Sequence, residues 1–176
     1  VVVNRLSHME DRIPLMVSER LVDVKESYRG KIVEVHGQFR SYNKHEESRN
    51  RLILSVFVRE FAFVGEEGTM TKPNSRLSTP VLDGYICKPP VYRMTPLGRE
   101  IADLLMAVNR PYGKSDYLPC ICWGRNARFA GKFEVGTHIH LWGRIQSRTY
   151  QKRLDNDVVE KRTAYEISVS KIECVE

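Results

Sequence analysis

An internal repeat limits the folds that this chain can adopt. A Val-Asn-Arg motif followed by an aspartate and a proline occurs twice, 105 residues apart, first as 3–5, Asp11 and Pro14 and again as 108–110, Asp116 and Pro119. A second block repeats 106 residues apart, because segment 30–41 returns as 136–147 with its glycines and its serine in step. Two matches in the same order and at nearly the same spacing indicate two copies of one fold unit.

Alternating apolar and polar residues, the pattern of half-buried β-strands, run through most of both copies. The clearest stretches are 31–41, 51–64, 137–146 and 164–175. Segment 99–108 has apolar residues at helical spacing, but its end aligns with the β-like start of the first copy, so we predict a strand there.

Short helices are favoured in two places. Segment 18–27 offers Ser18 as an N-cap, and segment 126–133 is its counterpart in the second copy. The charged segments 44–50 and 151–161 are expected to be loops that join two strands in each copy.

The division of the chain follows from residues 65–80, where glycine, proline, serine and threonine are frequent and large apolar residues are few. We expect this segment to be a linker between a first unit at 1–64 and a second unit at 81–176. Because Val1 already lies in a β-rich stretch, the first unit is expected to lack its opening strand.

Each unit is expected to contain five strands, with a short helix between the third and the fourth. This is the plan of the OB-fold, a small Greek-key barrel, although SH3-like barrels and split sheets could share the order. The sequence therefore predicts an all-β protein of two tandem five-stranded OB-fold barrels, the first of them incomplete.

The amino-acid composition indicates which classes of binding partner to expect. The 41% of hydrophobic residues suffices for a packed core, and the net charge of +6 favours a polyanion. No apolar segment is long enough to span a bilayer and no secretory signal is visible, so we expect no membrane partner.

The cysteines, Cys87, Cys120, Cys122 and Cys174, form no C-x-x-C pair of the kind that binds zinc. We expect reduced thiols in or near the core of a cytoplasmic protein. A metal site is the minority interpretation.

The sequence contains little that indicates an enzyme. His138 and His140 share one face of a predicted strand and resemble a metal pair, but we find no third ligand at a convincing spacing. No glycine-rich phosphate loop, nucleophile elbow or carboxylate pair stands out. We therefore expect no enzyme activity, no resident metal and no cofactor.

The second copy carries more specific motifs. In order they are VLDGYI at 81–86, PPVYRMTPLGREI at 89–101, AVNRPY at 107–112, DYLPCICWGR at 116–125 and GRIQSRTY at 143–150. Together they resemble the bacterial single-stranded DNA-binding protein family over about 81–175. Residues 1–64 share this resemblance mainly through the internal repeat.

The resemblance implies sequence-tolerant binding of single-stranded DNA in replication, recombination or repair. Aromatic rings stack on bases of any identity, at about 1–3 kcal/mol per base, while cations follow the phosphates. The family's ring positions correspond here to Tyr112, Tyr117, Trp123 and Tyr150. The cations that we expect around them are Arg110, Arg125 and Arg148 first, and then Arg93, Arg144 and Lys152.

Each ring also has a structural interpretation. Trp123 could be a core residue, Tyr112 a turn residue and Tyr117 part of a barrel wall. Tyr150 lies in a charged hairpin with little core to join, which favours exposure. Trp142 is more typical of packing or of a subunit contact than of a base platform.

In the first copy the positions equivalent to the four rings hold Ser7, Arg12, Ser18 and Lys44. The second unit is therefore expected to bind the bases, and the first unit to act mainly as a structural partner.

The family's assembly of four barrels implies a homodimer of this two-unit chain, with a monomer as the alternative and RNA as a further possible ligand. The family's acidic, apolar-tipped tail is not seen after residues 172–176, so we do not expect recruitment of partners through such a tail. A competing hypothesis is a primosome-like OB module for protein assembly, with secondary nucleic-acid binding.

Overall fold

The computed structural model describes residues 1–5, 7–46, 49–66, 81–153 and 158–175 of the chain. The first half contains β1 (Val2–Asn4), β2 (Glu10–Arg12), β3 (Leu15–Met16), β4 (Lys31–Glu46) and β5 (Arg49–Glu66). The second half contains β6 (Leu82–Ile86), β7 (Val91–Met94), β8 (Glu100–Arg110), the 3₁₀ turn η1 (Pro111–Gly113), β9 (Lys114–Trp123), α1 (Arg125–Ala130), β10 (His138–Arg153) and β11 (Val159–Cys174). None of the helices in these ranges has the length and apolarity needed to cross a membrane.

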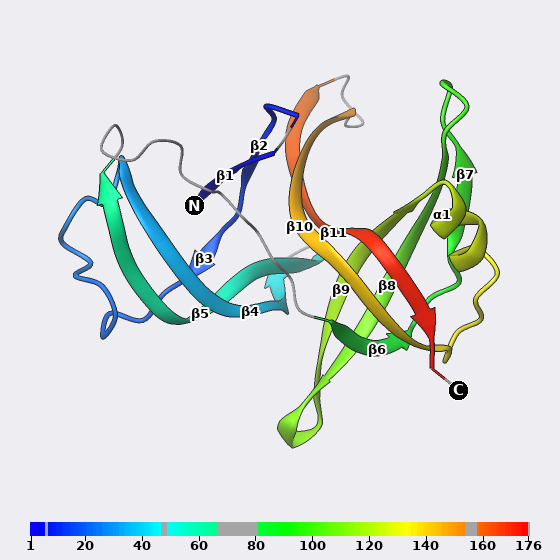
Figure 1. Ribbon diagram of the computed structural model, residues 1–176, viewed down its shortest axis with the longest axis horizontal. Helices are drawn as coiled ribbons and strands as arrows, with labels where there is room; N and C mark the ends of the chain where they lie inside the picture. Colours follow the sequence, from blue (N-terminus) through cyan, green and yellow to red (C-terminus); the bar gives the residue numbers. More distant parts are fainter. Residues whose placement is uncertain (6, 47–48, 67–80, 154–157, 176) are drawn as a thin grey trace.

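The second half closes into a barrel (Figure 1). Its strands pair in the order β6-β10-β11-β9-β8, and an additional pairing of β6 with β8 completes the ring. The remaining strand, β7, pairs only with the beginning of β8. This confirms the predicted all-β class and a five-stranded barrel of the OB type, with the helix between the third and fourth strands of the ring.

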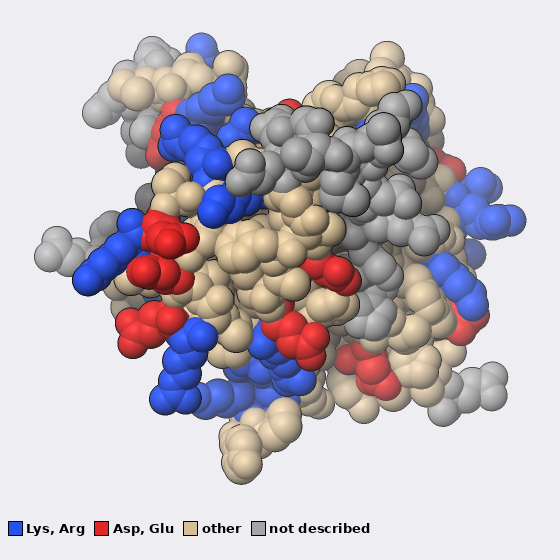
Figure 2. Space-filling view, turned by 60° about the vertical axis from the view of Figure 1, so that its left-hand side comes forward, with Lys and Arg blue, Asp and Glu red and all other residues tan. Residues whose placement is uncertain are grey.

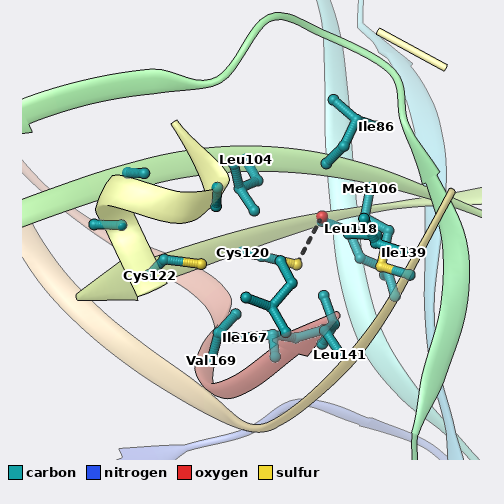
Figure 3. Close-up of a cluster of buried hydrophobic side chains, with 14 of the residues drawn as sticks. Ile86, Leu104, Met106, Leu118, Cys120, Cys122, Ile139, Leu141, Ile167 and Val169 are labelled. Atoms are coloured by element: carbon teal, nitrogen blue, oxygen red, sulfur yellow. Dashed lines mark hydrogen bonds between the residues drawn. The ribbon is translucent and has the colours of Figure 1, made fainter. Parts of the chain in front are cut away.

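The barrel interior is filled by alternate residues of its strands (Figure 3). Leu118, Cys120 and Cys122 of β9 point inward and are almost inaccessible to solvent, as are Ile139 and Leu141 of β10. Burying a side chain of leucine size contributes roughly 1.5–3 kcal/mol, so this cluster is the main apolar stabilisation of the barrel.

The four cysteines differ in how deeply they are buried. Burial raises the pKa of Cys122 to about 12 and that of Cys120 well above its usual range, so both stay protonated in the core. Cys87 is partly exposed, and its thiol donates to the Leu105 carbonyl. Cys174 is exposed, so the prediction of a core or near-core position is wrong for that residue.

One of the two predicted helices forms. In α1, Ala127 and Ala130 are fully buried and let the helix pack closely against β8, β9 and β11. The predicted strand at 99–108 is also confirmed, as β8.

Segment 18–27 forms turns rather than the predicted helix. The Asp23 carboxylate accepts the Lys25 N–H at 2.9 Å, and the Tyr28 hydroxyl accepts the Asp23 N–H at 2.7 Å. Such local hydrogen bonds compete with helical ones, and Leu21 and Val24 are exposed, so no apolar face would have been buried by a helix.

The two charged segments that we expected to be loops are largely strand. In the first half, β4 and β5 stay paired out to Glu46 and Arg49, and in the second, β10 and β11 stay paired out to Arg153 and Val159. Long arms therefore extend from both halves. The predicted linker lies mostly at 67–80, outside the described residues, whereas 65 and 66 belong to β5.

The first half has a more open arrangement. Strands β3, β5 and β4 form one sheet, and β1 and β2 form a separate hairpin. Ile13 and Pro14 connect the hairpin to the sheet, because β2 ends at Arg12 and β3 begins at Leu15. No pairing among the described residues closes these strands into a ring.

The repeat is visible in the pairing register. Strand β3 pairs in parallel with β5 through Leu15 and Val56, just as Cys120 of β9 pairs with Ile167 of β11. The repeated glycines also have a common reason, since each follows a bulge in its strand. A Cβ atom would lie 2.4 Å from a carbonyl oxygen of the paired strand at both Gly37 and Gly143.

The repeated aspartate and serine join the halves reciprocally. Asp11 accepts the Ser147 N–H at 2.8 Å, and Asp116 accepts the Ser41 N–H at 2.8 Å. In return, each serine Oγ accepts a backbone N–H from the residue after the aspartate of the other half. The two halves therefore meet through one set of contacts used twice, which we call the reciprocal junction.

Both aspartates of the reciprocal junction are buried and each is paired with an arginine of its own half. Arg5 Nε donates to Asp11 Oδ2 at 2.8 Å, and Arg110 Nε lies 2.9 Å from Asp116 Oδ2. Burial alone would raise the pKa of Asp11, but the hydrogen bonds from Arg5 and from the Ser147 backbone outweigh it and lower that pKa. The carboxylate is therefore held in its charged form.

Candidate nucleic-acid interface

All four predicted ring positions lie on the surface of the second half. The exposed fraction is 99% for Tyr112 and about 40% for each of Tyr117, Trp123 and Tyr150. None of these rings belongs to the apolar cluster inside the barrel. The surface of the second half therefore presents flat, partly apolar groups that a base could cover.

Strand β9 carries two of these rings. Tyr117 and Trp123 are six residues apart on a strand with uninterrupted pairing to β8, so they share its outer face. The residues between them at even positions fill the barrel core. The same alternation that builds the core thus places these two rings outside it.

Tyr112 occupies the turn η1 at the end of the β8–β9 hairpin. Its φ angle is +67°, a left-handed conformation that costs a non-glycine residue on the order of 1 kcal/mol. The neighbouring Gly113 has a φ of +69°. This backbone geometry holds the tyrosine ring fully in solvent, where it has no packing role.

Tyr150 lies on the β10–β11 arm beside an anchored arginine. The Arg148 guanidinium is 5.7 Å from the Tyr150 ring centroid, and its Nε donates to the buried Glu166 carboxylate at 3.3 Å. Gln146 donates to the same carboxylate at 2.9 Å. Ring and cation therefore share one face of the arm, as the even spacing of 146, 148 and 150 requires.

A further cation, not expected from the sequence, lies opposite Tyr150. Arg162 is the cross-strand partner of that tyrosine, and its hydrogen bond to Glu160 raises the pKa of its guanidinium. Only the register of β10 against β11 could have shown this neighbour.

Several predicted cations are already paired with carboxylates. Arg93 lies 2.9 Å from Asp103, and Arg144 lies 3.6 Å from Asp11. Arg110 belongs to the reciprocal junction, where its Nε lies 2.9 Å from Asp116, and its expected contact with DNA stays a prediction. By contrast, Arg125 and Lys152 are exposed, and neither forms an ion pair with another described residue.

Acidic and basic side chains are interspersed on the face shown in Figure 2 rather than separated into fields of one sign. In Figure 1 the β8–β9 turn and the outer end of the β10–β11 arm point to opposite ends of the molecule. The four rings are therefore spread over the second half, and a strand of DNA that contacts all of them must follow a path across its surface rather than enter a single pocket.

The first half lacks rings at the four equivalent positions but exposes others. Phe57 lies under the Arg40 guanidinium, with 4.5 Å between ring centroid and Cζ. Phe63 is half exposed, and the Lys31 ammonium is 5.3 Å from its centroid. Tyr42 is exposed as well. Tyr42 lies near Lys44, the position equivalent to Tyr150, but the comparison of repeat positions missed Phe57 and Phe63 because they occupy positions without a ring in the second copy.

Trp142 is partly buried in β10, with the Lys171 ammonium 4.3 Å from its ring centroid. This agrees with a packing role rather than an open platform.

The histidine pair does have a third group beside it. Asp83 of β6 accepts hydrogen bonds from both His138 and His140, a third group that no convincing spacing in the sequence had indicated. The carboxylate comes from 55 residues upstream and reaches the pair only through the pairing of β6 with β10.

Comparison with known proteins gives one family. The model of the single-strand binding protein family matches residues 77–175, more than half of the chain. Single-stranded DNA-binding protein 2 of Listeria innocua is 35% identical over 78 residues, which cover 40% of this chain and 49% of that protein. Single-stranded DNA-binding protein A of Bacillus subtilis is 32% identical over 84 residues, or 44% and 49% of the two chains. The chain thus spans about half the length of the curated relatives it matches.

Solved structures agree at the level of the fold. A deletion mutant of the single-stranded DNA binding protein from Thermus aquaticus superposes with a TM-score of 0.67 at 18% identity, covering 100% of this chain and 78% of the other. The wild-type protein from the same organism gives a TM-score of 0.61 at 17% identity, over 83% of this chain and 60% of that one.

Proposed function

Because the chain belongs to the single-strand binding protein family, we propose that it binds single-stranded DNA without reading its sequence and without catalysing a reaction. The observation that carries this proposal is the exposure of all four rings at the positions expected from the family motifs. Stacking on such rings tolerates any base, since every base has a π-face. The activity would support replication, recombination or repair in the cytoplasm.

The interface residues take distinct roles in this proposal. Tyr112, Tyr117, Trp123 and Tyr150 stack on bases, while Arg125 and Lys152 have their charge available for phosphates. Arg148 and Arg162 flank the Tyr150 ring, but their charge, like that of Arg93 and Arg144, is already shared with carboxylates. Arg110 has a structural role.

We propose that residues 1–66 form a degenerate OB-type unit, separated by a linker from the barrel at 81–176. Its support is the shared pairing register and the repeated glycine after each bulge. In this arrangement the first unit braces the second through the reciprocal junction. Two chains would then supply four units, and light scattering at several protein concentrations would test such a homodimer.

The experiment is a titration with fluorescently labelled oligo-dT at two salt concentrations. Removing both rings in Trp123→Ala/Tyr150→Ala should weaken binding by roughly a hundredfold, because each stacked base contributes about 1–3 kcal/mol. Trp142→Phe is the matched control, since it removes the other tryptophan without touching the proposed path. If the double variant binds as tightly as the unchanged chain, the DNA-binding proposal fails and an assembly module becomes the better account.

A further inference from the structure

A cluster of three side chains outside the DNA path has the composition of a metal site. Asp83 lies on β6 and the two histidines on β10. The Nε2 atom of His138 is 2.8 Å from Asp83 Oδ1, and the Nε2 atom of His140 is 2.9 Å from Asp83 Oδ2. One nitrogen or oxygen of each residue lies within 4.8 Å of the others.

The fold explains why these three groups meet. Residues 138 and 140 are two apart on a strand and so project from the same face. Asp83 is the direct antiparallel partner of His140, and the partner of His138 is Tyr85. Directly opposed residues on paired strands have Cβ atoms about 4.5–5.5 Å apart, which places the carboxylate between the two imidazoles.

The rings are also held in position. Tyr85 stacks on His138 with 4.5 Å between centroids, and the His140 ring meets the Trp142 ring edge to face at 6.5 Å. These contacts restrict the rotation of both imidazoles. A preorganised set of ligands loses less conformational freedom when an ion binds.

The charge of the cluster suits a cation. One carboxylate oxygen and two imidazole nitrogens are donor atoms of the kind that a divalent ion of the zinc class takes. The exposed fraction of the side chain is 61% for Asp83 and 29% and 35% for the two histidines, so an ion can reach all three.

We propose that Asp83, His138 and His140 bind a divalent ion of the zinc class through two imidazole nitrogens and one carboxylate oxygen. Two histidines with one carboxylate, and a fourth position left to water, form a known zinc ligand set. Imidazole favours zinc and its neighbours over calcium or magnesium, which prefer oxygen alone. Ligand atoms of a tetrahedral zinc site lie about 3.3 Å apart, given bonds near 2.0 Å, so each Nε2 has to separate from the carboxylate by about 0.5 Å. The proton that each Nε2 donates to Asp83 moves to Nδ1 of the same ring, which frees the nitrogen for the ion. The ligand atoms already lie within 4.8 Å of one another.

The test uses the full chain without a polyhistidine tag, after treatment with a chelator. Titration with Co²⁺ should produce the visible absorption of a four-coordinate site, and Zn²⁺ should displace it with a stoichiometry of one ion per chain. Asp83→Asn and His140→Ala should each weaken Zn²⁺ binding at least tenfold. Asp83→Asn keeps the side-chain shape, so it serves even if His140→Ala fails to fold.

The matched control is His36→Ala. His36 also lies on a strand and hydrogen-bonds a carboxylate two residues away, Glu34, at 3.0 Å, but it belongs to no cluster of three ligands among the described residues. This variant should bind Zn²⁺ like the unchanged chain. The proposal is overturned if the unchanged chain binds no Zn²⁺, if Asp83→Asn and His140→Ala bind it with unaltered affinity, or if His36→Ala removes the binding.

Discussion

The two halves of this chain share their pairing register but differ in closure and in surface. Both bend a long hairpin at a glycine, contain one parallel pairing of two residues and offer an aspartate and a serine to the other half. Among the described residues, only the strands of the second half close into a barrel. Only the second half has aromatic side chains at the four family positions. The duplicated residues are thus those that the packing requires, and the rings are not among them.

Residues that serve the fold are kept in both halves, whereas residues that serve a ligand occur in one. Gly37 and Gly143 are both constrained by a carbonyl oxygen, and Asp11 and Asp116 both satisfy backbone N–H groups across the reciprocal junction. Tyr150, in contrast, is replaced by Lys44 in the first half with no change in strand pairing. A ring that the barrel does not need is best explained by what it binds.

The largest expected effect comes from breaking the reciprocal junction. Asp116→Ala and Asp11→Ala should each reduce the free energy of unfolding by about 3 kcal/mol. Each change removes the carboxylate that pairs with an arginine of the same half and accepts a serine N–H of the other half. Urea denaturation measures this loss. Asp103→Ala is the control, since its pair with Arg93 is exposed and should contribute at most about 1 kcal/mol.

Unequal costs for the two aspartates would show that the junction is not reciprocal in energy. A large cost at Asp116 with none at Asp11 would mean that the second half is stable without the first.

The next effect tests the shared register. Gly37→Ala and Gly143→Ala should each lower the free energy of unfolding by about 2 kcal/mol, since the added methyl would lie 2.4 Å from a carbonyl oxygen and the strands must part. Thermal unfolding of both variants provides the measurement. If Gly37→Ala leaves the free energy of unfolding unchanged, the two halves differ in their need for glycine at the position where their structures are most alike.

A smaller effect is expected on DNA binding. Tyr150→Ala should weaken oligo-dT binding by about tenfold, whereas Tyr42→Ala should change it less than about twofold, because one stacked base contributes about 1–3 kcal/mol. Both tyrosines are exposed on the arm of their half, so the pair is matched. Fluorescence anisotropy distinguishes them, and equal losses would remove the functional asymmetry between the halves.

The smallest effect concerns pH. The pKa of Asp11 is lower in the folded chain than in the unfolded one, so its contribution to stability is complete above the ordinary carboxyl range, about pH 4. That contribution is lost as the pH falls through the lowered folded value. Unfolding curves at descending pH should show a steeper loss for the unchanged chain than for Asp11→Asn, and parallel curves would contradict this.

Much of the architecture could be predicted from the sequence. The repeat, the alternation in β9 and β10 and the exposure of the four rings all follow from local pattern and from the family motifs. The turns at 18–27 could not be predicted, because Asp23 and Tyr28 satisfy the backbone there in place of a helix.

The contacts between side chains on neighbouring strands could not be predicted from the sequence either. Asp83 reaches the histidine pair, Arg162 reaches Tyr150 and Arg110 joins the junction only once the register of the sheet is fixed. A one-residue shift in that register would move each of these groups to the opposite face.

The most direct test of the central claim is ultraviolet crosslinking of the full chain to oligo-dT, with the crosslinked residues mapped by mass spectrometry. Crosslinks are expected on the second half, at Tyr112, Tyr117, Trp123 and Tyr150. Crosslinks concentrated on the first half, at Tyr42, Phe57 and Phe63, would contradict it.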